Sequence, residues 1–224
     1  MDANRLLLIV NPRAGTLQSQ RPLFTIVDSF CAAGYEVTVR ITQAAGDAYA
    51  TAAACGGRYD MVVCVGGDGT LNEVTNGLMS LPVRPRLGYI PCGSTNDFAS
   101  SLRLPKRPLD AVGKILAGSP CPIDVGRFKD RYFNYVASVG AFTESSYAAP
   151  QATKNYLGHL AYILEGIKDL PRIRPYYVRV TVNNRTFEDE YIFGGVPNTL
   201  SMGGILKLAR LDVSLSDGVF EIHL

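Results

Sequence analysis

The first half of the chain alternates apolar runs of strand length with segments whose apolar positions recur every three or four residues. The apolar runs predict buried strands at 5–10, 61–65 and 86–90, and the alternating stretch 35–41 predicts a fourth. The helical pattern occupies 23–33, 47–55, 71–78 and 109–117. Strands that are apolar throughout are typical of a parallel sheet covered by helices on both faces. The sequence therefore predicts such a sheet, with ligands at the carboxyl ends of its strands.

The pattern changes near Gly118-Ser119-Pro120, and strand-like segments dominate after it. Strands are predicted at 123–128, 132–138, 176–182, 186–196 and 211–224, with one helix at 155–170. Asn183-Asn184 lies between two of these strands and indicates a hairpin turn. We therefore predict an α/β protein of two domains, a Rossmann-like parallel-sheet domain at 1–120 and a mostly antiparallel β-sandwich domain at 121–224.

Composition narrows the class of protein. The 224 residues carry a net charge of only +2, which argues against a nucleic-acid partner. The five cysteines are odd in number and widely spaced, so we expect reduced thiols in a cytoplasmic protein. The apolar runs are shorter than the roughly 18 residues of a membrane span, and the N-terminus does not have the pattern of a signal peptide. If a lipid is involved, the protein must therefore visit the membrane surface.

Three glycine-containing loops follow predicted strands, at 11–15, 66–70 and 91–97, and all should lie at one edge of the sheet. Bare backbone and exposed N–H groups suit phosphate, as do the hydroxyl groups of Thr70, Ser94 and Thr95. Asp68 and Asp97 suit Mg²⁺, which prefers oxygen ligands and shares them with phosphates. Each loop taken alone is equally compatible with a tight strand-to-helix turn. Neither the Walker pattern nor the dinucleotide pattern G-x-G-x-x-G is present.

These residues carry a resemblance to a known family. The stretch GGDGTLNEV at 66–74 resembles the nucleotide-binding signature of the diacylglycerol kinase and sphingosine kinase family, in its bacterial soluble branch. The loops NPRAG at 11–15 and PCGSTNDFA at 91–99 are similar to further motifs of that family, with Ser94 in place of a threonine. IDVG at 123–126, the segment 154–162 and LSDGVF at 215–220 also match. NAD kinases and phosphofructokinases share only the GGDG core, and NAD kinase is the enzymatic alternative.

The resemblance implies an ATP- and Mg²⁺-dependent lipid kinase that phosphorylates the hydroxyl group of a membrane lipid such as diacylglycerol. Asp68 and Asp97 would be the catalytic residues that organise the metal, and Glu73 would brace the loop. Arg13 either faces phosphate or is solvated. The implied nucleotide site consists of Asn11, Pro12, Arg13, Ala14, Gly15, Thr42, Gly66, Gly67, Asp68, Gly69, Thr70, Leu71, Asn72 and Ser94.

A second, structural Mg²⁺ is implied at Asp217 with the carbonyl groups of Ser214 and Val219, although Asp217-Gly218 also fits an ordinary hairpin turn. The implied partners are ATP, a lipid alcohol and, transiently, the membrane surface, and we allow for a homodimer. Aromatic and apolar residues that either line an acyl cleft or pack in the core are Phe142, Tyr147, Tyr156, Leu160 and Tyr162.

The sequence departs from the family pattern at its C-terminal end. The family places its general base in an Asp-Gly-Glu segment, which this chain does not contain, and residues 221–224 end on a strand-like pattern. We therefore expect either a C-terminally short chain with poor catalysis or a changed function. The alternative from another class is a non-catalytic protein that binds nucleotide or lipid.

Overall fold

The structure is a computed structural model that describes residues 4–15, 22–140, 175–199, 201–202, 206–207 and 214–224. The predicted helix at 155–170 and the five candidate acyl-cleft residues lie outside these ranges.

A four-stranded parallel sheet forms the N-terminal half, as predicted, with the strand order β2-β1-β3-β4. Its strands are β1 (Asn4–Val10), β2 (Tyr35–Ile41), β3 (Met61–Gly66) and β4 (Arg86–Pro91). The helices are α1 (Leu23–Ala32), α2 (Asp47–Cys55), α3 (Asp68–Met79), α4 (Asp97–Ser101) and α5 (Pro108–Ala117), with a short 3-10 helix, η1 (Gly56–Arg58). The short helix α4 was not predicted, because five residues are too few to show a period.

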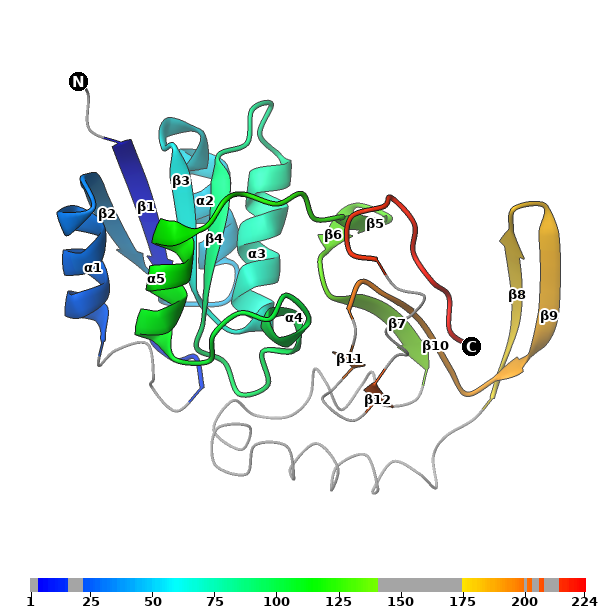
Figure 1. Ribbon diagram of the computed structural model, residues 1–224. Helices are drawn as coiled ribbons and strands as arrows, with labels where there is room; N and C mark the ends of the chain where they lie inside the picture. The colour runs from blue at the N-terminus through cyan, green and yellow to red at the C-terminus, as the bar shows by residue number, and fades with distance from the viewer. Residues whose placement is uncertain (1–3, 16–21, 141–174, 200, 203–205, 208–213) are drawn as a thin grey trace.

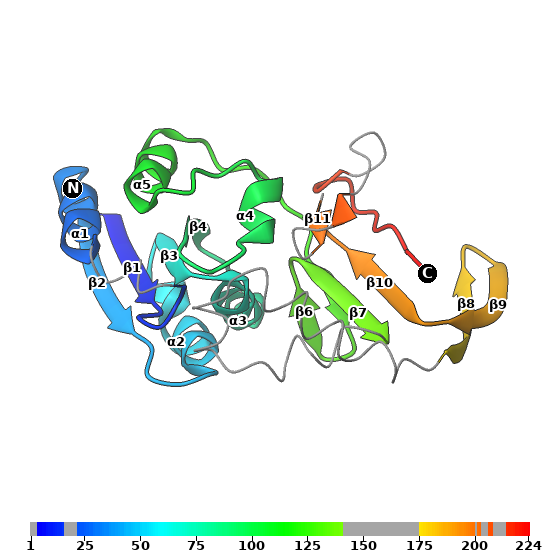
Figure 2. The ribbon, with the colours of Figure 1, turned by 90° about the horizontal axis from the view of Figure 1, so that it is seen from below.

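Helices cover both faces of the sheet. As a result, β3 is buried along its whole length and β1 along its last five residues. Leu6 and Leu8 pack with α1 and α5, while Leu7 and Ile9 pack with α2 and α3. Figures 1 and 2 show these two layers on opposite sides of the sheet. The alternation along β1 therefore divides the interior into two hydrophobic clusters, and it leaves the carboxyl edge of the strands for loops.

The second half consists of antiparallel pairs: β5 (Gly126–Phe128) with β6 (Arg131–Phe133), β7 (Val136–Gly140) with β10 (Phe193–Pro197), β8 (Tyr176–Val182) with β9 (Arg185–Tyr191), and β11 (Ser201–Met202) with β12 (Leu206–Lys207). The hairpin turn is confirmed, since Asn183 and Asn184 have φ of 50° and 63°.

Four predicted strands of this half differ in the structure. The predicted strand 123–128 is shortened to β5, because the Asp124 N–H donates to the Leu215 carbonyl oxygen at 2.8 Å and not to a neighbouring strand. The predicted strand 132–138 is divided into β6 and β7, because the chain turns at Asn134-Tyr135 to bond with Asn198. The predicted strand 186–196 is divided into β9 and β10 at Ile192. Residues 214–224 form only a single bridge, between His223 and Gly195, because a turn at Gly218, with φ of 76°, directs the chain toward Asp124.

Side-chain hydrogen bonds join the two halves. The Asn76 side chain on α3 donates to the Tyr132 carbonyl oxygen and accepts from the Tyr132 N–H, both at 2.8 Å. Ser101 at the end of α4 shares a 2.6 Å hydrogen bond with Thr199. The Asn76 side chain thus satisfies both backbone polar groups of one residue of β6, as a neighbouring strand would. In the part of the chain that the structure describes, no helix is long and apolar enough to cross a membrane.

Candidate active site

The three predicted loops meet at the carboxyl edge of the sheet. The Asn11 side chain donates to the hydroxyl oxygen of Thr70 at 2.9 Å, which joins the first loop to the start of α3. The Cys92 N–H donates to the carbonyl oxygen of Gly66 at 2.7 Å, which joins the second loop to the third. The convergence predicted for these loops is therefore present.

Two of the loop glycines are required because neighbouring backbone leaves no room for a side chain. Gly15 has φ of 56°, and a Cβ atom there would lie 2.4 Å from the carbonyl oxygen of Cys92. A Cβ atom on Gly93 would lie 2.6 Å from the Cα atom of Gly67. Gly69 differs, because a Cβ atom there would meet no atom within 4 Å. Packing explains Gly15 and Gly93, whereas the bare backbone at Gly69 has no explanation within the described fold.

Asp68 is the first residue of α3, and it also caps α4. Its carboxylate accepts hydrogen bonds from the N–H groups of Asp97 at 3.1 Å and Phe98 at 3.3 Å. The residue before α4, Asn96, has φ of 53° and gives the helix no side-chain cap. Burial, and then the nearby Asp97, raise the pKa of Asp68 to about 6. The site therefore holds a carboxyl group that gains a proton more readily than usual.

Asp97 is only 6% exposed, and the Tyr135 hydroxyl group donates a hydrogen bond to its Oδ2 atom at 2.9 Å. Two neighbouring carboxyl groups, one of them with a raised pKa, are a favourable place for a cation. Among the described residues, no group of three or more His, Cys, Asp or Glu side chains could hold a metal ion. A Mg²⁺ ion at Asp68 and Asp97 would therefore take its other ligands from phosphate and water, as Mg²⁺ commonly does.

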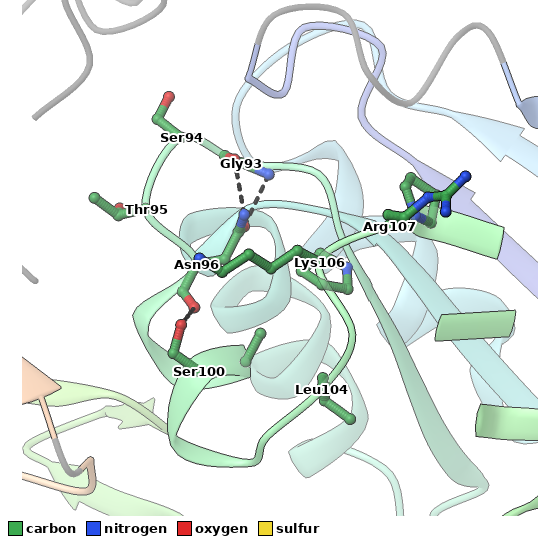
Figure 3. Close-up of a pocket in the computed structure, with 11 residues that line it drawn as sticks. Gly93, Ser94, Thr95, Asn96, Ser100, Leu104, Lys106 and Arg107 are labelled. Carbon is green, nitrogen blue, oxygen red and sulfur yellow. Dashed lines mark hydrogen bonds between the residues drawn. The ribbon is translucent and has the colours of Figure 1, made fainter. Parts of the chain in front are cut away.

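A cavity of about 450 Å³ opens beside the third loop (Figure 3). The Asn96 side chain clamps this loop, since it accepts from the Gly93 N–H at 2.8 Å and donates to the Gly93 carbonyl oxygen at 2.7 Å. The exposed hydroxyl groups of Ser94 and Thr95 line the cavity and form no hydrogen bond with the described residues. Figure 3 shows the Lys106 side chain extending toward Asn96. The cavity thus combines two free hydroxyl groups with a positive charge.

Comparison with known proteins identifies the family. The family described as "Diacylglycerol kinase catalytic domain" matches residues 5–128. A diacylglycerol kinase from Bacillus subtilis is 40% identical over 220 residues, which are 97% of this chain and 72% of that protein. One from Staphylococcus epidermidis is 36% identical over 97% of this chain and 69% of its own length. The chain belongs to the diacylglycerol kinase family. A crystal structure of a diacylglycerol kinase from Bacillus anthracis has 30% identity and a TM-score of 0.79 over 99% of this chain and 73% of its own.

Membership of this lipid-kinase family decides the enzyme class and argues against NAD kinase, which shares only the GGDG core. Family and structure also agree on the fold, an N-terminal parallel sheet followed by antiparallel strands. The roles of single residues follow from neither.

Thr42 and Ser94 lie at opposite ends of the same sheet edge, after the outer strands β2 and β4. The Thr42 N–H donates to the Val10 carbonyl oxygen at 2.9 Å. The next turn is held by Asp47, whose carboxylate accepts from the N–H groups of Gln43 and Ala44. These hydrogen bonds lower the pKa of Asp47. A nucleotide that contacts both Thr42 and Ser94 would therefore lie across all four strands.

Other predicted residues divide into buried and accessible ones. The side chains of Ala14 and Leu71 are buried in the two hydrophobic clusters, so only their backbone can face a ligand. Arg13 is exposed, and its N–H donates to the Asn11 side chain at 2.9 Å. The half-buried Asn72 and Glu73 side chains form no hydrogen bond or ion pair with the described residues. Asn72 is therefore available to a ligand, and the bracing role predicted for Glu73 is not visible as a contact.

The proposed structural metal site has the geometry of a turn. The Asp217 carboxylate accepts from the Val219 N–H at 3.0 Å, and the Gly218 N–H donates to the Asp124 carboxylate at 2.7 Å. Sequence reasoning noted the IDVG motif but missed Asp124 as the partner of this turn. The contact joins residues 94 positions apart, which no local pattern reveals. The second metal ion at Ser214, Asp217 and Val219 stays a prediction.

Proposed function

We propose that this chain binds ATP along the carboxyl edge of the sheet and, with Mg²⁺, transfers the γ-phosphoryl group to the hydroxyl group of a membrane lipid such as diacylglycerol. The observation that carries this proposal is the Asp68–Asp97 pair beside the three joined glycine loops. Metal-bridged phosphates need carboxylate ligands next to bare backbone, and this edge supplies both.

Phosphoryl transfer depends mainly on positioning and on neutralising charge. The lipid hydroxyl oxygen bonds to the γ-phosphorus, the bond from that phosphorus to the bridging oxygen breaks and ADP leaves, while the hydroxyl proton passes to water. Asp68 and Asp97 would hold Mg²⁺, which would neutralise the charge that develops on the phosphates. The Thr70 and Ser94 hydroxyl groups would donate to phosphate oxygens, and Gly69 would let phosphate approach the backbone.

In the same proposal, the two halves of the chain bind different substrates. Residues 1–120 bind the nucleotide, and residues 121–224 present the lipid, which the protein meets at the cytoplasmic face of the membrane. Names of the relatives support the lipid: those from Bacillus subtilis and Staphylococcus epidermidis are called diacylglycerol kinase. The balanced net charge gives no support to a nucleic-acid partner.

The test is transfer of labelled γ-phosphate from ATP into vesicles of phosphatidylglycerol with 5–10% diacylglycerol, with and without Mg²⁺. We expect labelled phosphatidic acid that depends on Mg²⁺, and a loss of at least about 100-fold in kcat for Asp97→Asn. Asp110→Asn is the control, because Asp110 is an exposed carboxylate on α5 beside Arg107. ATP binding without any labelled lipid would instead favour the non-catalytic alternative.

A further inference from the structure

The position of the buried Asp97 side chain is not determined by α4 alone. This helix has five residues and no cap of its own, and it packs beside β11. Asp97 stands next to Asp68, and two carboxylates repel each other when neither has a cation. A side chain that donates to Asp97 from outside the helix therefore contributes to where the carboxylate points. Tyr135 is such a donor, at 2.9 Å from Oδ2.

Tyr135 is itself firmly held in the second half of the chain. Its carbonyl oxygen accepts from the Asn198 N–H at 2.7 Å, and the Asn198 side chain donates to the Asp124 carbonyl oxygen at 2.6 Å. Its ring packs against the hydrophobic cluster that also contains Phe98, the residue after Asp97. Both the backbone and the ring of Tyr135 are thus fixed, so its hydroxyl group has a defined position.

A closed circuit of contacts connects Tyr135 to the other carboxylate. Helix α3 carries Asp68 at its start and Asn76 two turns later, and Asn76 holds the backbone of Tyr132 on both its polar groups. Three residues further on, Tyr135 donates to Asp97, and the Asp97 N–H returns to Asp68 at 3.1 Å. Because the circuit closes, the second half of the chain sets the separation of the two carboxylates.

We propose that Tyr135 is a positioning residue through which the β-rich half holds Asp97 in place to share a divalent cation with Asp68. This rests on the proposed function, because it assumes that the two carboxylates organise the metal. The effect of Tyr135 is exerted through Asp97, to which its hydroxyl group donates. Contacts of this kind commonly change metal affinity or activity by 10- to 100-fold when they are lost.

The test compares Tyr135→Phe with Tyr132→Phe in the full chain. Both variants lose one phenolic hydroxyl group from neighbouring positions, but the Tyr132 hydroxyl group forms no hydrogen bond with the described residues. Mn²⁺ binding in the presence of a non-hydrolysable ATP analogue is measured by electron paramagnetic resonance, which requires no turnover. We expect the Mn²⁺ dissociation constant to rise about 10- to 100-fold in Tyr135→Phe and less than about twofold in Tyr132→Phe.

A second variant tests the circuit at another point. Asn76→Ala breaks the circuit without touching Tyr135 or Asp97, and we expect weaker Mn²⁺ binding there also. Mn²⁺ binding within twofold of the unaltered protein in Tyr135→Phe, or in Asn76→Ala if Tyr135→Phe does not fold, overturns the proposal. In the lipid assay, kcat should fall and KM for lipid should not change. If the unaltered protein binds Mn²⁺ but labels no lipid, the proposed function fails while the role of Tyr135 stands on the binding data.

Discussion

Asp68 combines two roles whose electrostatic demands conflict. As a cap for α4 it accepts two backbone hydrogen bonds, which favour the charged form, yet burial and Asp97 raise its pKa to about 6. The carboxyl group of Asp68 therefore binds a proton more tightly in the folded protein than in the unfolded chain, where its pKa is near 3.8. The stability from this group is complete below about pH 4 and is lost as the pH rises through 6. A cation bound at the site would remove the penalty.

The first prediction is that this contribution of Asp68 to stability is lost as the pH rises. In EDTA, the free energy of unfolding of the unaltered protein should fall relative to Asp68→Asn between pH 4 and pH 7.5, by up to roughly 3 kcal/mol. Urea unfolding of both proteins across this range measures the difference, and any constant loss from the altered cap of α4 cancels in its pH dependence. Asp47→Asn is the contrasting control: hydrogen bonds lower the pKa of Asp47, so its effect has the opposite sign and appears only below about pH 4, and its difference should be nearly constant between pH 4 and pH 7.5. A pH-independent difference between the unaltered protein and Asp68→Asn would contradict the account.

Gly69 gives the second prediction, because space exists for a methyl group there. Gly69→Ala should leave the free energy of unfolding unchanged or raise it by up to about 1 kcal/mol, since alanine favours helix. We expect it to raise KM for ATP at least about tenfold, since the added methyl group would occupy the space that phosphate needs.

Gly113→Ala is the matched control, because Gly113 lies inside α5 and also has open space. Thermal unfolding and ATP titration of both variants separate the two effects. Equal ATP affinity in Gly69→Ala and Gly113→Ala would mean that no phosphate approaches the backbone at Gly69.

At the scale of elements, the segment just before α5 contributes a positive charge to the site through Lys106. It lies just before α5 and extends across the cavity toward the third loop (Figure 3). Lys106→Ala should raise KM for ATP about 3- to 10-fold at low salt, because an exposed charge near a phosphate contributes about 1 kcal/mol. At 0.5 M KCl the effect should largely disappear. Lys114→Ala removes the same charge from the last turn of α5 and should have no effect; an equal effect there would indicate a general charge effect.

The elements also show how far sequence reasoning reaches. The four parallel strands and their long helices were predicted, because apolar runs and helical periods are local patterns. In the second half, the chain turns at Asn134-Tyr135 and at Gly218, where bonds to Asn198 and Asp124 replace strand pairing. Such turns are set by residues far away in the sequence. The same reason explains why Asp68 and Asp97 were predicted as neighbours, since their loops share an edge, while Tyr135 was missed.

At the scale of the molecule, Asn76 joins the two halves through two hydrogen bonds. It is half-buried on α3 and forms hydrogen bonds with both polar groups of Tyr132, and also with the Asn72 carbonyl oxygen. Removing the side chain leaves the backbone N–H and carbonyl groups of Tyr132 without these partners. Asn76→Ala should therefore lower the free energy of unfolding by about 2 kcal/mol, since each unsatisfied group costs about 1–3 kcal/mol and alanine returns part of it through helix propensity.

Asn72→Ala makes this prediction specific, because it removes the same side chain one turn earlier on α3. The Asn72 side chain forms no hydrogen bond with the described residues, so its loss should leave stability unchanged while weakening ATP binding. Urea unfolding measures the first effect, and hydrogen exchange locates it: in Asn76→Ala, the amides of 131–140 should exchange faster while those of β1 and β3 keep their protection. If exchange increased equally in both halves, Asn76 would support α3 alone. If it increases only in the second half, the docking of that half can loosen without unfolding the parallel sheet, and the position of Asp97 depends on that docking.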